Sequence, residues 1–289
     1  LELEMPSTGG VNDRQVAAAV QEGRLQEAHV DRAASRVTEL ILAAQNNATA
    51  LEVDFKAHHA LARKAAAEGA VLLKNEANVL PLTPKDSVAL IGAFAKTPRY
   101  QGAGSSQVNA TQIDTPLALW REKLGEEKVT YAQGFEAELA TEDKALIEEA
   151  VALAKQAKVA IVMAGLPPLF EAEGFDRAHL RQPAQIENLI EAVAAANPNT
   201  VVVLSNGAPI EMPWIDATPA VLEIYLAGQA GAGALVDLLY GEVNPSGKLP
   251  MTFPIRLVDH ASSANFPMDG EPINPTDALF GVDEKAESE

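Results

Sequence analysis

Three carboxylates lie in a short loop that directly follows an apolar run of strand length. Glu171, Glu173 and Asp176 come after residues 158–166, and Arg177 closes the group. A solvated loop, with the arginine paired to its neighbour Asp176 and the glutamates facing water, accounts for such a cluster. A glutamate held beside apolar groups and other carboxylates would instead tend to keep its proton and could act as a general acid. The spacing leaves both interpretations open.

A second candidate is the glycine-rich stretch GAGSS at residues 102–106. Dinucleotide binding needs its glycines in the turn between a strand and a helix, so that the helix N-terminus meets the phosphate. Here the glycines stand apart from the apolar run 87–95, and the residues after them show no helical pattern. A tight loop that approaches a sugar, with Ser105 or Ser106 donating hydrogen bonds, fits better. We therefore expect these serines to bind substrate.

Other catalytic patterns are absent from the sequence. The five histidines include no pair at i, i+4 spacing, there is no cysteine, and no serine lies in a G-x-S-x-G motif. We therefore predict no metal site, no cofactor and no serine or cysteine nucleophile. Trp214 lies just after the end of an apolar run, where it either faces a sugar or covers the core.

The chain of 289 residues is acidic, with a net charge of −18 and a pI of about 4.7. Such a surface repels phosphate backbones and anionic lipid, so we predict no nucleic-acid partner and no membrane partner. The sequence shows no apolar run that approaches roughly 18 residues and no basic start of a signal peptide. The lack of cysteine fits the cytoplasm but also suits secreted or periplasmic proteins. A start without methionine predicts a fragment or a processed piece.

The candidate loops must be positioned by a larger scaffold. Helical spacing of apolar residues over 14–45 is broken at Gly23, and further helical patterns alternate with strand-length runs along the rest of the chain. The apolar runs are continuous rather than alternating, which indicates strands buried on both faces; they lie at 87–95, 158–166, 200–212 and 220–228. We predict an α/β fold with a mostly parallel sheet sandwiched by helices. Ligands bind beyond the carboxyl ends of such strands, so the glycine-rich loop and the carboxylate loop are expected to converge.

Five segments, in order along the chain, resemble the C-terminal part of a family 3 glycoside hydrolase of the bacterial β-glucosidase type. They are LELEMPSTGGVND, AAAEGAVLLKNEANVLPL, GAGSSQV, EAEGFDR and GQAGAGALVDLLYGEVNPSGKLPMTFP. The resemblance implies a six-stranded α/β sandwich over residues 47–255. Residues 1–46 would be the last piece of a (β/α)8 barrel with a linker, and residues 256–289 would lead toward a fibronectin type III-like domain.

The resemblance also implies a retaining β-glucosidase, in which a barrel aspartate attacks the anomeric carbon and a sandwich-domain glutamate protonates the departing oxygen. Glu173 is favoured for that glutamate because it immediately precedes GFDR, and Glu171 joins Ser105 and Ser106 as a predicted substrate-binding residue. The aspartate belongs to an S-D-W motif that this sequence lacks. The chain would then act with an N-terminal barrel domain of the same enzyme on a β-glucoside or oligosaccharide. The alternatives are a non-catalytic carbohydrate-binding or scaffold module and, less favoured, a nucleotide-binding α/β domain.

Overall fold

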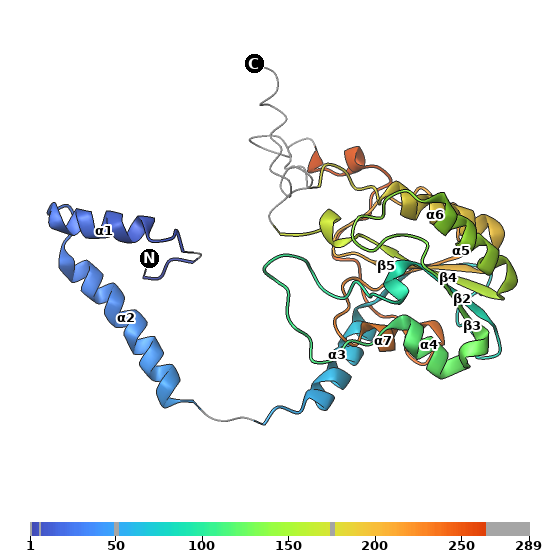
Figure 1. The fold of residues 1–289 in the computed structure, drawn as a ribbon, viewed down its shortest axis with the longest axis horizontal. Coiled ribbons are helices and arrows are strands. Elements are labelled where there is room, and N and C mark those ends of the chain that lie inside the picture. Colours follow the sequence, from blue (N-terminus) through green and yellow to red (C-terminus); the bar gives the residue numbers. More distant parts are fainter. Residues whose placement is uncertain (1, 6, 49–51, 174–176, 264–289) are drawn as a thin grey trace, which may run out of the picture. The chain divides into compact units, whose positions relative to one another are not determined.

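The computed structural model describes residues 2–5, 7–48, 52–173 and 177–263. The chain forms two compact units, Leu1–Asp54 and Phe55–Glu289. The first unit contains α1 (Val11–Gln21) and α2 (Glu27–Asn46), seen in blue in Figure 1. The predicted break between the two helices is confirmed, since Gly23 adopts a left-handed φ of 73° that glycine tolerates. The assignment of this unit to a barrel, and the predicted domain ends, stay predictions.

The second unit is built on one six-stranded sheet with the strand order β1-β6-β5-β4-β2-β3. The strands are β1 (Val71–Asn75), β2 (Val88–Ile91), β3 (Val129–Ala132), β4 (Val159–Gly165), β5 (Thr200–Ser205) and β6 (Ala220–Glu223). All neighbouring pairs are parallel except β1 with β6, which is antiparallel. This confirms the predicted mostly parallel sheet.

Helices cover both faces of the sheet, as the buried strand runs require (Figure 1). One layer consists of α3 (Phe55–Gly69), α4 (Pro116–Leu124) and α7 (Gly231–Leu239), and the other of α5 (Lys144–Gln156) and α6 (Ala184–Ala196). Short 3₁₀ helices lie at Ala93–Ala95, Glu126–Lys128, Pro168–Phe170, Ile215–Ala217 and Leu257–Asp259. None of the helices in the described ranges combines the length and apolarity that a membrane crossing requires.

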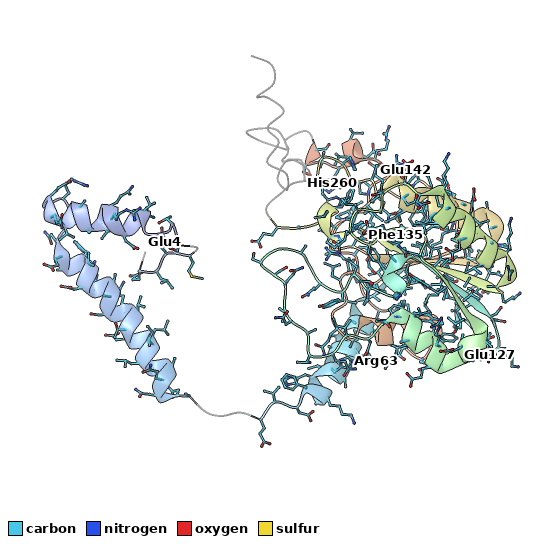
Figure 2. All side chains as sticks on the ribbon, in the orientation of Figure 1. Glu4, Arg63, Glu127, Phe135, Glu142 and His260 are labelled. Atoms are coloured by element: carbon cyan, nitrogen blue, oxygen red, sulfur yellow. The ribbon has the colours of Figure 1, made fainter. Side chains whose placement is uncertain are left out.

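The core lies between the sheet and its two helix layers. Every residue of β4 and β5 is buried, and Phe135 lies in the packed interior, where its ring meets Phe94 edge to face at 5.0 Å (Figure 2). At the end of β2, a Cβ on Gly92 would lie 2.3 Å from the carbonyl oxygen of Met163. Glycine at that position, with a φ of 112°, therefore lets the end of β2 pack tightly against β4.

Two predicted strands end earlier than the apolar runs that indicated them. The run 200–212 is a strand only to Ser205, and the run 220–228 only to Glu223. Asn206 and Gly207, which favour turns, follow the first of these strands directly. Tyr225 follows the second and adopts a left-handed φ of 55°, which lies outside the β region. Turn chemistry therefore ends each strand while the sequence is still largely apolar.

Candidate active site

The two candidate loops meet at the carboxyl edge of the sheet. The glycine-rich loop follows β2, and the carboxylate loop follows β4. Ala103 in the first forms a parallel bridge to Ala172 in the second, so the two backbones run side by side there. β2 and β4 are also the neighbouring strands at which the order of the sheet reverses, where an open α/β sheet forms its binding crevice. The predicted convergence is confirmed.

Glu173 lies at the exposed rim of this junction, and its carboxylate accepts a hydrogen bond from the Ser105 hydroxyl. Gly104 adopts a φ of 85°, and a Cβ there would lie 3.2 Å from the Cβ of Glu173, so glycine permits the close approach. Ser106 is also exposed, but its hydroxyl donates to Ala103 O at 3.5 Å within its own loop. An exposed carboxylate that a hydroxyl orients can exchange protons with a group outside the domain.

Glu171 precedes Glu173 by two positions but is turned inward. Its side chain is 16% exposed, and its Oε2 accepts the Gly207 N–H at 2.9 Å in the turn after β5. The Nη2 atom of Arg99 lies 3.9 Å from the same oxygen. Asp176, the third carboxylate of the predicted cluster, lies outside the described residues. Glu171 is therefore held by internal contacts, whereas Glu173 faces solvent.

Two arginines, Arg99 and Arg177, interact electrostatically with Glu171. Arg99 is 8% exposed, and burial lowers its pKa while the negative charge of Glu171 opposes that effect. Arg177 is partly buried, and its Nη1 donates to Pro209 O at 3.0 Å. Burial lowers the pKa of Arg177, and Glu171 again opposes the shift. The negative charge of Glu171 therefore acts against the effect of burial on both guanidinium groups.

Glu223 is a further carboxylate of the site, and the sequence analysis did not predict it. It is fully buried at the end of β6, where it accepts the Tyr225 N–H at 2.6 Å and an Nδ2–H of Asn206 at 2.9 Å. Burial raises the pKa of Glu223 well above its ordinary value, and the neighbouring charge of Glu171 adds to the rise. A signal was present in the sequence, because a single glutamate interrupts the apolar run 220–228.

The structure also places the other features that the sequence singled out: the histidines, Trp214 and the turn after β2. Across the described residues, no group of three or more His, Cys, Asp and Glu side chains could hold a metal ion. His59 contacts Asp114, with Nε2 2.9 Å from Oδ2, and also receives a hydrogen bond from the Gln229 side chain. Trp214 is 1% exposed, so it covers the core rather than facing a sugar. The helix that follows the glycine-rich loop, α4, begins at Pro116, so this loop is not the strand-to-helix turn of a phosphate site.

Comparison with known proteins now identifies the family. A model described as the glycosyl hydrolase family 3 C-terminal domain matches residues 70–283. The chain belongs to this family. The match spans the six-stranded sandwich together with the glycine-rich loop and the carboxylate loop.

Individual relatives agree with the family assignment. The chain is 48% identical over 285 residues to a thermostable beta-glucosidase B of Acetivibrio thermocellus, which covers 97% of this chain and 37% of that protein. It is 39% identical over 292 residues to an exo-alpha-(1->6)-L-arabinopyranosidase of Bifidobacterium breve, covering 97% of this chain and 38% of the relative. A crystal structure of a Bifidobacterium adolescentis GH3 beta-glucosidase superposes with a TM-score of 0.81 at 40% identity, over 94% of this chain and 40% of that one. The chain therefore spans less than half the length of these relatives.

Proposed function

We propose that this chain is the part of a retaining β-glucosidase that supplies the general acid/base, with Glu173 as that residue. The nucleophilic aspartate belongs in this proposal to a barrel domain of the same enzyme, and the substrate is a terminal, non-reducing β-D-glucosyl residue. Retaining hydrolysis uses two carboxyl groups roughly 5 Å apart on either side of the scissile bond. In this proposal the α/β sandwich contributes one of these two carboxyl groups, that of Glu173.

The contrast between Glu171 and Glu173 carries this proposal. Glu171 is 16% exposed and accepts the Gly207 N–H, whereas Glu173 is exposed at the carboxyl edge of the sheet. A group that protonates a substrate bound to another domain must reach out of its own domain. The hydroxyl of Ser105, which donates to Glu173, limits the directions in which that carboxylate can point.

The chemistry assigned to Glu173 has two steps. In the first, the protonated carboxyl gives its proton to the glycosidic oxygen as the barrel aspartate bonds to the anomeric carbon and the aglycone leaves. In the second, the carboxylate takes a proton from water, which attacks the glycosyl-enzyme and releases the sugar. We assign Ser105, Ser106 and Glu171 to the binding of the substrate, as polar groups beside the proton donor.

The sugar is tested separately from the acid/base role, because the relatives differ in the sugar for which they are named. The relative at 48% identity is named a beta-glucosidase and the one at 39% an arabinopyranosidase. Rates on aryl β-glucosides, β-xylosides and α-L-arabinopyranosides, measured with the complete enzyme, test the assignment. We expect the glucoside to give the highest kcat/KM. A higher value for either other sugar would contradict this part and leave the acid/base role intact.

The acid/base role is tested with Glu173→Gln in the complete enzyme. Substrates with poor leaving groups should lose roughly 10²–10⁴-fold in rate, because their oxygen must be protonated as the bond breaks. An aryl glucoside with an acidic phenol needs little protonation, so its first step should be nearly preserved and the glycosyl-enzyme should accumulate. Azide needs no general base, so it should restore turnover and yield a β-glycosyl azide. The alkaline limb of the pH profile should also disappear.

Two control variants accompany this test. Glu142→Gln changes another exposed glutamate, labelled in Figure 2, and should leave every one of these measurements unchanged. Glu171→Gln should keep the wild-type dependence on the leaving group. If azide rescues Glu171→Gln rather than Glu173→Gln, the acid/base role belongs to Glu171. If azide rescues neither variant and both bind sugar normally, the chain is a non-catalytic carbohydrate-binding or scaffold module.

A further inference from the structure

Arg99 is a buried cation with no role in the proposed chemistry. It lies in the segment that leads from β2 to the glycine-rich loop and is 8% exposed. A buried guanidinium is costly unless its donors are satisfied, and a nearby carboxylate reduces the cost further. Glu171 provides that carboxylate at 3.9 Å.

The three hydrogen bonds of Arg99 end on backbone carbonyls of both site loops. Its Nε donates to Leu166 O at 3.2 Å, and its Nη2 donates to Glu171 O at 3.0 Å. These two carbonyls stand at the start of the carboxylate loop and just before Glu173. Its Nη1 donates to Gln101 O, at the entrance to the glycine-rich loop. The Arg99 side chain is therefore hydrogen-bonded to the backbones of both loops.

These contacts flank the place where the loops touch. Gln101 precedes Ala103, and Glu171 precedes Ala172, the two residues that form the bridge between the loops. Beyond the bridge, Ser105 on one loop donates to Glu173 on the other. A shift of either loop relative to the other would therefore change both the bridge and the position of the Glu173 carboxylate.

We propose that Arg99 is a positioning residue for Glu173, acting through the backbones of the two loops that it joins. This inference rests on the proposed acid/base role of Glu173. Arg99 itself touches no reacting atom. The planar guanidinium directs its donors along fixed directions, whereas a lysine ammonium is a single point on a flexible stem. A lysine at this position would keep the charge near Glu171 but could not reach all three carbonyls in the same geometry.

The test is Arg99→Lys in the complete enzyme. A misplacement of about 1 Å can cost roughly 10²-fold in rate, so we expect a fall of that order in kcat for a substrate with a poor leaving group. KM should stay within about twofold, because the loss falls on the transition state and not on uniform binding. An aryl glucoside with an acidic phenol should lose much less in its first step. If Arg99 only stabilises the fold, Arg99→Lys should lower the rates on both substrates by the same factor, because only the fraction of folded enzyme changes.

Arg63→Lys is the matched control. Arg63 lies on α3 (Figure 2). It donates twice to Asp237 on α7, from Nε to Oδ2 at 2.7 Å and from Nη2 to Oδ1 at 2.6 Å. Its replacement also removes a fixed guanidinium contact, yet the dependence on the leaving group should stay wild type. If Arg99→Lys and Arg63→Lys behave alike while Glu173→Gln shows azide rescue, the positioning role is wrong and the acid/base role stands. If Glu173→Gln shows no rescue, the proposed function itself fails.

Hydrogen exchange tests the same inference without a measurement of activity. The amide of Val108 donates to Gln101 Oε1 at 2.9 Å in one loop, and that of Phe170 donates to Pro167 O at 2.9 Å in the other. If Arg99 joins the loops, these amides open together and their protection factors should agree within about threefold. In Arg99→Lys both should exchange faster, and in Arg63→Lys neither should. Protection that differs by about a hundredfold between the loops of the unmodified chain would overturn the proposal.

Discussion

Glu171 and Glu173 should respond to truncation in opposite ways, although two positions separate them. Glu171→Ala removes the acceptor of the Gly207 N–H and the carboxylate that faces buried Arg99. A hydrogen bond to a charged group contributes about 1.5–3 kcal/mol, and the loss of the counter-charge adds to it. Because the Glu171 side chain is 16% exposed, solvent screens this contact only in part. We expect the free energy of unfolding to fall by about 2–3 kcal/mol.

Glu173→Ala should cost far less stability. The side chain is exposed and its described partner is the hydroxyl of Ser105, so the change should stay below about 0.5 kcal/mol. Activity should show the reverse order. In the complete enzyme Glu173→Ala should slow substrates with poor leaving groups by roughly 10²–10⁴-fold. Glu171→Ala should leave the dependence on the leaving group unchanged, because Arg99 keeps its three backbone contacts.

The assay is thermal and urea unfolding of the isolated chain, followed by circular dichroism, beside kinetics of the complete enzyme. For a compact unit of the size of Phe55–Glu289, each kcal/mol shifts Tm by about 2–4 °C, so Glu171→Ala should lower Tm by roughly 4–12 °C. Glu142→Ala provides the baseline for an exposed glutamate. Equal destabilisation by the Glu171 and Glu173 variants would refute the reasoning, since it requires Glu173 to be as firmly held as Glu171.

Three further results are expected. The isolated chain should hydrolyse no aryl β-glucoside, because retention needs two carboxyl groups roughly 5 Å apart and the chain supplies one of them; robust turnover by purified chain would contradict this. Replacing both Ser105 and Ser106 with alanine in the complete enzyme should raise KM without lowering Tm, as both are exposed, whereas lost stability with unchanged kinetics would mark the loop as structural. Burial raises the pKa of Glu223, so its contribution to stability is full below the pKa of glutamate in the unfolded chain and is lost as pH rises through the folded-state pKa. In urea unfolding, Glu223→Gln should therefore gain stability relative to wild type as pH rises above the pKa of glutamate in the unfolded chain, and a difference that does not change with pH would contradict the assignment.

The fold class was predictable because burial leaves a direct pattern in the sequence. Residues 159–165 and 200–205 are buried without exception, and their continuous Val, Ile and Leu content indicates strands covered on both faces. The strand order and the antiparallel β1 could not be predicted from the residues. They depend on which strands pair across the sheet, and the residues of a run such as Val71–Asn75, which pairs antiparallel with β6, do not mark the direction of pairing.

The site was predictable only where side chains mark it. Glu173 and Ser105 stood out by residue type, and the rule that loops meet at the carboxyl edge of a parallel sheet brought them together. Arg99 did not stand out, because its hydrogen bonds end on the carbonyls of Leu166, Gln101 and Glu171. Every residue has a carbonyl, so a contact of this kind leaves no pattern in the sequence.

The strand order explains why two neighbouring glutamates differ in their surroundings. β4 lies between β5 and β2, so the loop that follows it has one neighbouring loop on each side. Glu171 contacts Gly207 in the turn after β5, and Glu173 contacts Ser105 in the loop after β2. The first contact holds the loop to the sheet, and the second leaves a carboxylate at the rim. If β4 were an edge strand, the loop that follows it would have a neighbouring loop on one side only. Glu171 and Glu173 could then not each contact a different loop.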